Sequence, residues 1–251
     1  MSAEARREYR AAMTDRTALM LGTEALRRLE EARVIVVGLG GVGSWCAEAL
    51  VRTGIGHLSI VDHDLVSANN LNRQAQAFST SIGRPKAEAL AARLREIDPY
   101  TDIASLDTRF TAASANEFAL GSYDCVVDAI DDVDDKIALI ASALASGAGL
   151  YSSMGAAWRR DPTRVRTAPL SKTQGCPLAR AVRRRLKTKD IPSEFLCVYS
   201  DEPSPVFADR RRADLASGDK RANGSLVQVT AVFGLTLAAL VVNRIAGDNF
   251  M

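Results

Sequence analysis

Residues 33–64 read RVIVVGLGGVGSWCAEALVRTGIGHLSIVDHD, and this stretch decides the fold. An apolar run leads into the glycine loop Gly38–Gly43, which opens a helical segment, and a second apolar run ends on Asp62. Glycines allow a tight turn and a close backbone approach to a phosphate, whose charge meets the free amides at the helix start. A carboxylate placed 24 positions after Gly38 is suited to binding ribose hydroxyls. The stretch therefore predicts a nucleotide site built from Gly38, Gly40, Gly41, Gly43 and Asp62.

The bulk composition is that of an ordinary soluble domain, with 251 residues, 47% hydrophobic and 25% charged, and a net charge of +2. The total charge gives no argument for nucleic-acid binding. The 4 cysteines form no C-x-x-C pair, which argues against a paired-ligand zinc site and a disulfide framework and suits a reducing cytosol. The N-terminal MSAEARREYR has no apolar core segment, so we expect no secretory signal and a cytoplasmic location.

The order of apolar and helical segments predicts an α/β protein with a Rossmann-like, mostly parallel sheet. After the opening unit we expect a helix from Pro85 to Ile97 and strands at 101–106, 123–129 and 149–153. Residues 2–31 are expected to form one or two helices. The chain divides into a nucleotide-binding portion, residues 1–153, and a C-terminal portion, residues 154–251, which we expect to form one integrated domain.

The C-terminal portion has a less regular pattern, for which we predict antiparallel strands at 158–166 and 197–200 around a basic insert. Residues 226–245 are almost wholly apolar and long enough to span a membrane. Polar residues such as Gln228 and Asn243 interrupt the run. It is therefore better interpreted as a helix buried under the sheet or in a dimer interface, and we expect no membrane span.

Polar side chains collect where the predicted parallel strands end, which is where open α/β sheets bind their ligands. Arg73 and Lys86 can neutralise phosphate charge, and Asp131 can hold Mg²⁺ through oxygen. A nicotinamide cofactor brings only a pyrophosphate and needs no metal, so this set favours ATP with Mg²⁺. The predicted nucleotide contacts beyond the glycine loop are Asp62, Asp64, Asn70, Arg73, Lys86 and Asp128, of which Asp128 could instead orient its loop.

Basic residues gather between positions 159 and 189, where 11 lysines and arginines accompany a single acid, Asp161. Such a cluster can supply sequence-independent contacts with RNA phosphates, although many basic runs are ordinary solvated faces. The predicted RNA patch comprises Arg159, Arg160, Arg183, Arg184 and Arg185, with a further cluster at Arg210–Arg212.

Several of these motifs resemble the ubiquitin-activating-enzyme-like superfamily, whose members adenylate a carboxylate with ATP. The resemblance lies in GLGGVG, the D-x-D at Asp62/Asp64, N-x-x-R-Q at Asn70–Gln74, G-x-P-K at Gly83–Lys86 and D-A-I-D at Asp128–Asp131. Further blocks at 155–166, 176–187, 198–203 and 223–234 resemble one branch, the tRNA threonylcarbamoyladenosine dehydratases. The resemblance covers nearly the whole chain.

The resemblance implies ATP-dependent cyclisation of threonylcarbamoyladenosine at position 37 of tRNA, with Mg²⁺ as cofactor. It also implies that Arg16 reaches into the partner subunit's ATP site, beside the catalytic residues Arg73, Lys86 and Asp131. A homodimer is expected because the apolar C-terminal segment needs a partner surface. A sulfur-transfer protein is a further conceivable partner, but Leu215 stands where some relatives have a cysteine.

Other functions remain open at this point. A relative that adenylates a ubiquitin-like sulfur carrier would predict a protein partner and often C-x-x-C pairs, which this sequence lacks. A nicotinamide-dependent oxidoreductase would leave Asn70, Arg73, Lys86 and Asp131 without a task. An RNA-binding module with a vestigial nucleotide site would not need these residues either. Cys176 lies where protein-activating relatives carry a thioester cysteine, but we interpret it as an ordinary residue before Pro177.

Overall fold

The computed structural model describes residues 3–203 and 223–247, in which a single sheet organises the chain. The sheet has the strand order β3-β2-β1-β4-β5-β7-β6. Neighbouring strands are parallel except for the antiparallel pair β6–β7, so the predicted mostly parallel sheet is confirmed. The strands are β1 Arg33–Val37, β2 His57–Asp62, β3 Asp102–Asp107, β4 Cys125–Asp128, β5 Gly149–Ser153, β6 Val165–Pro169 and β7 Leu196–Ser200.

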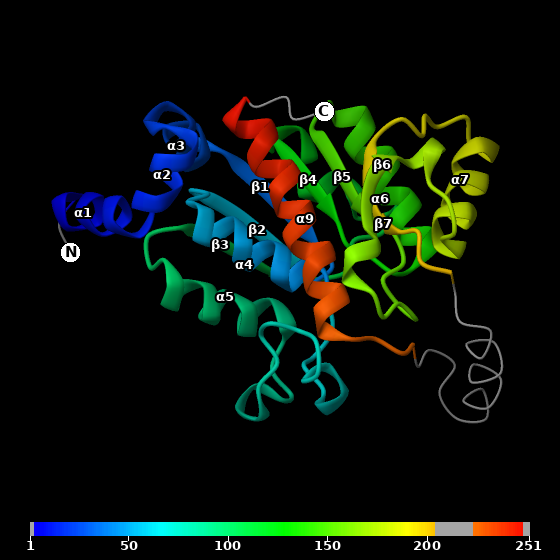
Figure 1. Ribbon diagram of the computed structural model, residues 1–251, viewed down its shortest axis with the longest axis horizontal. Coiled ribbons are helices and arrows are strands. Elements are labelled where there is room, and N and C mark those ends of the chain that lie inside the picture. Colours follow the sequence, from blue (N-terminus) through cyan, green and yellow to red (C-terminus); the bar gives the residue numbers. More distant parts are fainter. Residues whose placement is uncertain (1–2, 204–222, 248–251) are drawn as a thin grey trace.

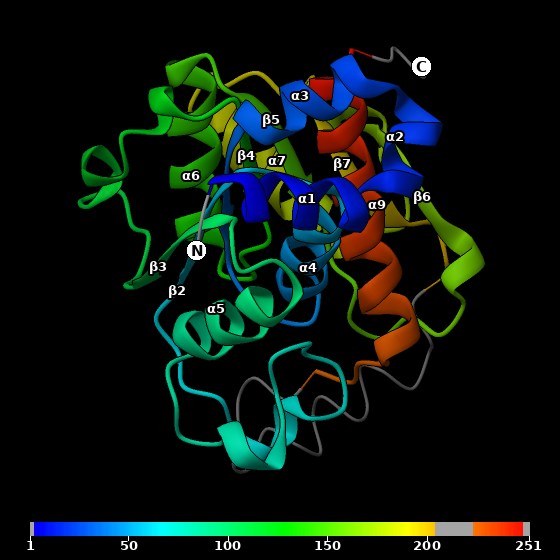
Figure 2. The ribbon, with the colours of Figure 1, turned by 90° about the vertical axis from the view of Figure 1, so that its left-hand side faces the viewer.

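Helices cover both faces of the sheet (Figures 1 and 2). On one face lie α4 (Gly43–Thr53), α5 (Lys86–Ile97) and α9 (Val227–Ala246), and on the other lie α6 (Val133–Ser146) and α7 (Pro177–Thr188). The strands alternate between these two cores, since Val34 and Val36 of β1 pack with the first set of helices and Ile35 and Val37 with the second. Strand β1 is thus buried on both sides, as expected for a central parallel strand.

Helix α9 occupies the apolar stretch that was expected to be a buried helix. In Figure 1 it crosses the sheet beside α4, and it packs against both α4 and the sheet. By length and composition alone it could span a membrane, but half of its apolar window is buried against the rest of the protein. Val229, Phe233, Leu237 and Val241 have no exposed surface, so the stripe is part of the core.

The N-terminal region forms three helices where one or two were expected: α1 (Ala3–Met13), α2 (Asp15–Leu21) and α3 (Thr23–Glu31). The chain breaks at Thr14, which leaves helical geometry, and at Gly22, whose φ of +84° is in the left-handed region. Buried Arg10 holds α1 to the domain, because its Nη2 donates to Gly54 O at 2.8 Å and its Nε lies 3.3 Å from Asp98 Oδ2.

The predicted strand at 158–166 is wrong in its first part. Trp158 has a φ of +62°, which no strand accommodates, and Asp161 caps a short turn at Pro162–Arg164. The strand β6 begins only at Val165 and pairs with β7, which itself pairs in parallel with β5. Residues 154–164 therefore form a loop at the carboxyl end of β5, beside the other strand ends.

Candidate functional site

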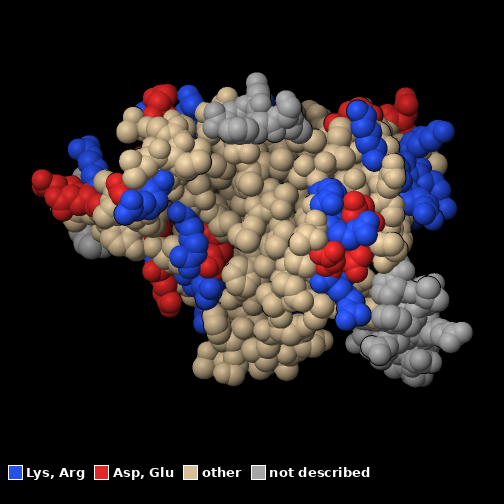
Figure 3. All heavy atoms as spheres, viewed as in Figure 1, with Lys and Arg blue, Asp and Glu red and all other residues tan. Residues whose placement is uncertain are grey.

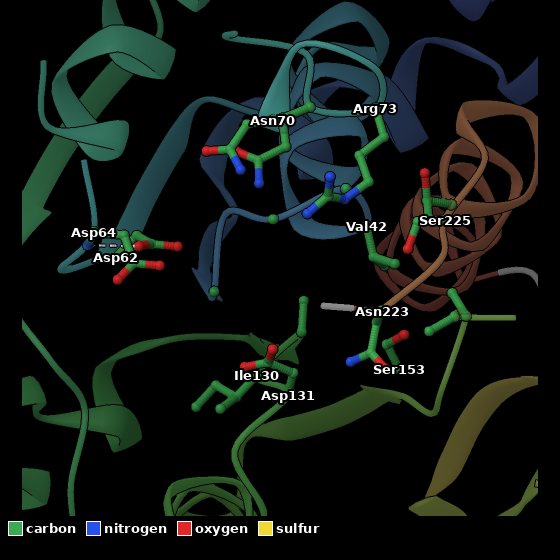
Figure 4. A pocket seen from close by; sticks show the side chains of 18 of the residues that line it. Val42, Asp62, Asp64, Asn70, Arg73, Ile130, Asp131, Ser153, Asn223 and Ser225 are labelled. Atoms are coloured by element: carbon green, nitrogen blue, oxygen red, sulfur yellow. Dashed lines mark hydrogen bonds between the residues drawn. The ribbon is translucent and has the colours of Figure 1, made fainter. Parts of the chain in front are cut away.

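A cavity of about 1200 Å³ opens at the carboxyl ends of the central strands. In Figure 4, Asp62 and Asp64 lie at one end, Arg73 faces Asp131 across the middle, and Asn223 lies at the opposite end. We call these the Asp62 end and the Asn223 end. Most of the polar residues that the sequence singled out are thereby brought to one site.

The glycine loop forms the floor between the two ends. Gly38 has a φ of +91°, and a Cβ there would lie 2.7 Å from Ala129 O. A Cβ on Gly43 would lie 1.8 Å from the carbonyl oxygen of Gly38, so Gly43 shapes the turn from behind the cavity wall. Gly40 is different: it lines the cavity, and nothing lies within 4 Å of a Cβ built on it. Helix α4 starts after Val42 without a side-chain cap, and its start lies at the cavity, where helix N-termini favour an anion. The N–H of Ser44 in its first turn donates to Gly40 O at 3.2 Å.

Asp62 ties the glycine loop to the end of β2. Its Oδ2 accepts the N–H of Leu39 at 2.7 Å, and its Oδ1 accepts the N–H of Asp64 at 2.9 Å. The side chain is buried but still lines the cavity. The predicted ribose contact stays a prediction, and the structure adds a second task for Asp62, which is to set the path of the loop.

Lys86 is the first residue of α5 and reaches back to the Asp62 end. Its Nζ lies 2.7 Å from Asp64 Oδ2 and 3.9 Å from Asp62 Oδ1, and its side chain is only 8% exposed. Burial alone would raise the pKa of Asp64, but the hydrogen bond and charge of Lys86 outweigh it and hold that pKa below its ordinary value. The ammonium group is thus fixed at the cavity by Asp64.

Arg73 enters the cavity from the segment that follows Asn70. Its Nη1 donates to Asn69 O at 2.7 Å and to Asn72 Oδ1 at 2.9 Å, which orients the guanidinium. Burial lowers the pKa of Arg73, and the charge of Asp131 across the cavity acts against that shift. A Cβ on Gly41 would lie 3.1 Å from the Arg73 side chain, so a glycine here leaves room for the arginine.

Asp131 and Asp128 differ in where their carboxylates lie. Asp131 lines the cavity, on the loop between β4 and α6. Asp128 is fully buried outside the cavity, where its Oδ2 accepts from Lys136 Nζ at 2.7 Å and Ser152 Oγ at 2.6 Å. Its Oδ1 accepts the N–H of Ile130 at 3.1 Å. The structure therefore does not place Asp128 as a nucleotide contact, because its carboxylate is sealed behind the wall, and it fits the other interpretation, orientation of the loop.

Among the described residues that line the cavity, two groups offer carboxylate oxygens to a divalent cation, besides Asp135, whose Oδ2 already accepts from Arg109 Nε at 2.6 Å. Asp131 lies in the middle, opposite Arg73. Asp62, His63 and Asp64 lie close enough to share an ion, with ligand atoms within 4.8 Å of one another. The ammonium of Lys86 already balances the second group, so Asp131 is the better match to a hard cation that accompanies phosphates.

Arg16 lies away from this cavity, on α2. Its side chain is 90% exposed, and its Nε lies 3.8 Å from Asp15 Oδ2. The prediction that it enters a partner subunit's site therefore stays a prediction, and it is compatible with a side chain that extends from the surface.

The Asn223 end is formed by segments that the sequence analysis did not assign to the site. Gly224 packs on the Trp158 ring, where a Cβ would lie 3.1 Å from the ring carbons, and Trp158 N donates to Gly224 O at 2.8 Å. The sequence block 223–234 could have pointed to this end of the cavity, because its Gly224 packs against the indole ring of Trp158. The wall here comprises Ser153–Ala157, Arg159, Cys176–Leu178 and Asn223–Ser225.

One member of the predicted RNA patch, Arg159, is wrong as a surface contact. Arg159 is 2% exposed and donates to the backbone oxygens of Glu202 and Gly175. Arg183 is partly buried and donates from Nη1 to Leu170 O at 3.0 Å and to Thr173 O at 3.1 Å, so its contact with RNA stays a prediction. Arg160, Arg184 and Arg185 are exposed, and the cluster Arg210–Arg212 and Leu215 lie outside the described residues.

The 4 cysteines are free and buried. Burial raises the pKa of Cys125 and of Cys197 to about 12, which keeps them as inert thiols. Cys176 lines the Asn223 end, and its Sγ accepts the N–H of Ala179 at 3.5 Å as the cap of α7. This contact gives Cys176 a structural task.

Comparison with known proteins finds relatives that match along the whole chain. The model of the ThiF family matches residues 14–250. The tRNA threonylcarbamoyladenosine dehydratase of Bacillus subtilis is 35% identical over 239 residues, covering 93% of this chain and 94% of that protein. The Escherichia coli protein of the same name is 37% identical over 238 residues, covering 87% of each. The sulfur carrier protein adenylyltransferase of Thermus thermophilus is 36% identical but covers only 51% of this chain.

Among solved structures, too, a tRNA threonylcarbamoyladenosine dehydratase is more similar to this chain than a more distant enzyme of the same fold. The crystal structure of the E. coli dehydratase, TcdA, in complex with ATP superimposes with a TM-score of 0.85 at 33% identity, covering 94% of this chain and 95% of that one. The structure of the same protein with AMP gives the same values. E. coli MccB with ATP, at 15% identity and a TM-score of 0.65, shares the fold.

Proposed function

This chain belongs to the ThiF family, and we propose on that basis that it is an ATP-dependent tRNA threonylcarbamoyladenosine dehydratase. The observation that carries the proposal is the continuity of the cavity. The nucleotide residues of the Asp62 end open directly into the Asn223 end. The dehydratases match nearly the whole chain, whereas the sulfur-carrier relative matches about half of it. One cavity can thus hold ATP beside the group that it activates.

The proposed reaction has two steps. An oxygen of the threonyl carboxylate attacks the α-phosphorus of ATP, the bond to the bridging oxygen breaks, and pyrophosphate leaves from the acyl-adenylate. The neighbouring carbamoyl group then attacks the activated carbonyl carbon, the ring closes, and AMP leaves with the carboxyl oxygen, so that the substrate loses one water overall. Both reacting groups belong to the same nucleoside, so proximity replaces an enzyme nucleophile.

Each cavity residue has a task in that scheme. The amides at the start of α4 and the cations Arg73 and Lys86 surround the phosphates and stabilise the charge that develops there. Asp64 holds Lys86 in place before the nucleotide arrives. Asp62 and Asn70 bind the sugar and its surroundings, and Arg16 completes the site from a partner subunit.

Mg²⁺ fits this site because Asp131 offers carboxylate oxygens beside the phosphate-binding cations. When bound, the ion neutralises phosphate charge and makes pyrophosphate a better leaving group. Asp131 is the residue that would hold it.

The partner subunit has a candidate surface. Figure 3 shows an uncharged face over α9 and the segment that follows β2. Its exposed apolar side chains are unusually large for a surface that meets only water, which favours a second copy of this chain as occupant. The exposed large apolar side chains of these two segments and of the residues just before α9 are Leu65, Leu71, Phe78, Ile82, Leu226, Val227 and Leu235.

The tRNA surface is a revised version of the predicted patch. Without Arg159, the patch keeps the exposed Arg160, Arg184 and Arg185 and the partly buried Arg183. Arg180 and Lys187 of α7 are also exposed, and their helical spacing puts them on the same face as Arg184. We propose that this exposed face of α7 contacts the tRNA backbone while the modified base enters the cavity. A tRNA substrate and 4 free cysteines suit a cytoplasmic enzyme.

One assay tests the proposal. Purified protein is given ATP, Mg²⁺ and tRNA that carries threonylcarbamoyladenosine, and AMP and pyrophosphate are measured. We expect one AMP per cyclised nucleoside and none with tRNA that lacks the modification. Pyrophosphate release driven by a small sulfur-carrier protein, with none driven by the modified tRNA, would overturn the dehydratase assignment and support the alternative.

A further inference from the structure

Arg159 is a buried cation in the wall of the Asn223 end. It follows β5 in the loop at the carboxyl edge of the sheet and is 2% exposed. It lines the cavity together with Cys176 and Leu178. A residue this basic is almost never so fully buried unless its charge is balanced.

The contacts of Arg159 leave its charge unbalanced in the part of the chain that the structure describes. Nη1 donates to Glu202 O and Nη2 to Gly175 O, the latter at 3.0 Å, but these carbonyls carry no net charge. Its Nε is buried and has no hydrogen-bond partner among the described residues. The carboxylate of Glu202 is turned elsewhere, since it accepts the backbone N–H groups of Arg160 and Asp161.

Another arginine nearby shows the usual arrangement. Arg164 on the same loop places its Nε 2.8 Å from Asp201 Oδ1, and Arg166 shares that carboxylate at 3.4 Å. Both are more exposed than Arg159, so they need a counter-charge less. Arg164 of this loop and Arg166 of β6 therefore share an acid, whereas the buried Arg159 has no such partner among the described residues.

The position of Arg159 is fixed from both sides. Trp158 holds a φ of +62°, and its ring and backbone pack on Gly224. Trp158 Nε1 also donates to Asn223 Oδ1 at 3.1 Å. The carbonyls of Gly175 and Glu202 hold the guanidinium itself, so the charge is preorganised and costs little to position when a ligand arrives.

We propose that Arg159 makes the Asn223 end a carboxylate subsite, which receives the threonyl carboxylate before that group is adenylated. The proposal rests on the proposed function and goes beyond it by naming what selects the acceptor group. A buried charge acts through a low local dielectric, so a carboxylate at this wall is favoured over a neutral group of the same shape. The incoming carboxylate supplies the negative charge that the wall lacks.

The test compares two ligands and three variants. The ligands are the free nucleoside threonylcarbamoyladenosine and its methyl ester, used as inhibitors of AMP formation with modified tRNA. The variants are Arg159→Gln, Arg159→Lys and the control Arg183→Gln. The control also removes a guanidinium bound to backbone carbonyls, but one that does not line the cavity.

The wild type should bind the acid more tightly than the ester by about tenfold to a hundredfold, the range of a hydrogen bond to a charged group. Arg159→Gln should bring the ratio close to one, Arg159→Lys should keep a part of it, and Arg183→Gln should leave it as in the wild type. The affinity for ATP should stay within about twofold in all of them, because the nucleotide lies at the other end.

Three outcomes would overturn the inference. The first is that Arg159→Gln binds the acid and the ester with the same affinity ratio as the wild type. The second is that Arg183→Gln loses as much of this ratio as Arg159→Gln does. The third is a ratio near one in the wild type itself, a result that does not depend on any variant being folded. In each of these outcomes the wild type still forms AMP with the modified tRNA. If the proposed dehydratase function were wrong, the wild type would form no AMP at all. The subsite at Arg159 and the dehydratase function are therefore tested by different results.

Discussion

Lys136 Nζ lies 2.7 Å from Asp128 Oδ2, and neither side chain has any exposed surface. The same carboxylate accepts Ser152 Oγ and the N–H of Ile130, so one buried group joins α6, β5 and the loop that carries Asp131. An ion pair this deep stabilises only weakly on balance, because both charges lose their hydration. Its value lies in fixing the loop at the cavity.

Removing Lys136 should expose how much the loop depends on this pair. Lys136→Met leaves Asp128 buried without its counter-charge, and we expect a loss of about 3–5 kcal/mol in the free energy of unfolding. Urea unfolding measures it. The double variant Asp128→Asn with Lys136→Met removes both charges and should recover at least half of the loss. If the double variant were no more stable than the single one, the pairing would not be the cause.

The glycine loop can be tested by one substitution within it and a glycine control elsewhere. Gly43→Ala places a methyl group 1.8 Å from Gly38 O and should displace the loop, so ATP binding should fall below detection. Gly121→Ala is the control, because it lies outside the cavity and the nearest atom to the new carbon, Ser146 O, would be 3.7 Å away. Calorimetric titration with ATP compares them. Equal affinities would show that the loop tolerates a shift and that its geometry does not define the phosphate site.

Arg73 and Lys86 are expected to act on the transition state. Replacing either by Ala should lower AMP formation by about a hundredfold to a thousandfold, the usual cost of one electrostatic contact. The fold should survive Lys86→Ala, since Asp64 is 56% exposed and water can solvate it. Arg84→Ala removes an exposed cation two positions earlier and serves as the control. Near-wild-type turnover in the Arg73 or Lys86 variant would remove that residue from the mechanism.

The ion pairs of Glu48 should make the free energy of unfolding depend on pH in the acid range. Burial alone would raise the pKa of this side chain, but hydrogen bonds from Arg93 and Arg52 lower it below the ordinary 4.5. A lowered native pKa adds stability that is fully present above 4.5 and is lost as the pH falls through the native value. The stability difference between the wild type and Glu48→Gln should therefore shrink below pH 4.5 and stay constant from pH 6 to about 8. A difference that grows on acidification would contradict this assignment.

The sequence predicted those parts of the site whose residues belong to short, contiguous motifs. The glycine loop, Asp62 and the cations Arg73 and Lys86 each follow a strand end or begin a helix, and the parallel topology then brings them together. Arg159 was misassigned because its partners, the carbonyls of Gly175 and Glu202, come from turns that are distant in the sequence. No local pattern in a basic run says which members will turn inward.

Lys136 was missed for a different reason, because it follows a run of acids that resembles a solvated face. A usable signal was present. Lys136 falls on the same stripe as Leu139, Ile140 and Ala143, three, four and seven positions later, which is the spacing of a buried helical face. A lysine on such a stripe predicts a buried partner, and the aspartate at the end of β4 was the nearest candidate.

The exposed face of α7 gives the last prediction, which concerns how tRNA is held. Arg184 and Lys187 lie on this face with no ion-pair partner among the described residues, and we expect each to contact one phosphate. Each lost contact should weaken tRNA binding and flatten the dependence of log K on log salt by about one unit. The double variant Arg184→Ala with Lys187→Ala should thus raise the KM for tRNA and leave the affinity for ATP unchanged.

The matched control is Arg6→Ala with Arg7→Ala, which removes the same charge from exposed positions on α1. Its salt slope should equal that of the wild type, because long-range charge is screened at the salt concentrations of the titration. Filter binding of the modified tRNA across a range of salt separates the cases. A slope that falls equally in both double variants would mean that tRNA responds to net charge alone, and the face of α7 would then be an ordinary solvated surface.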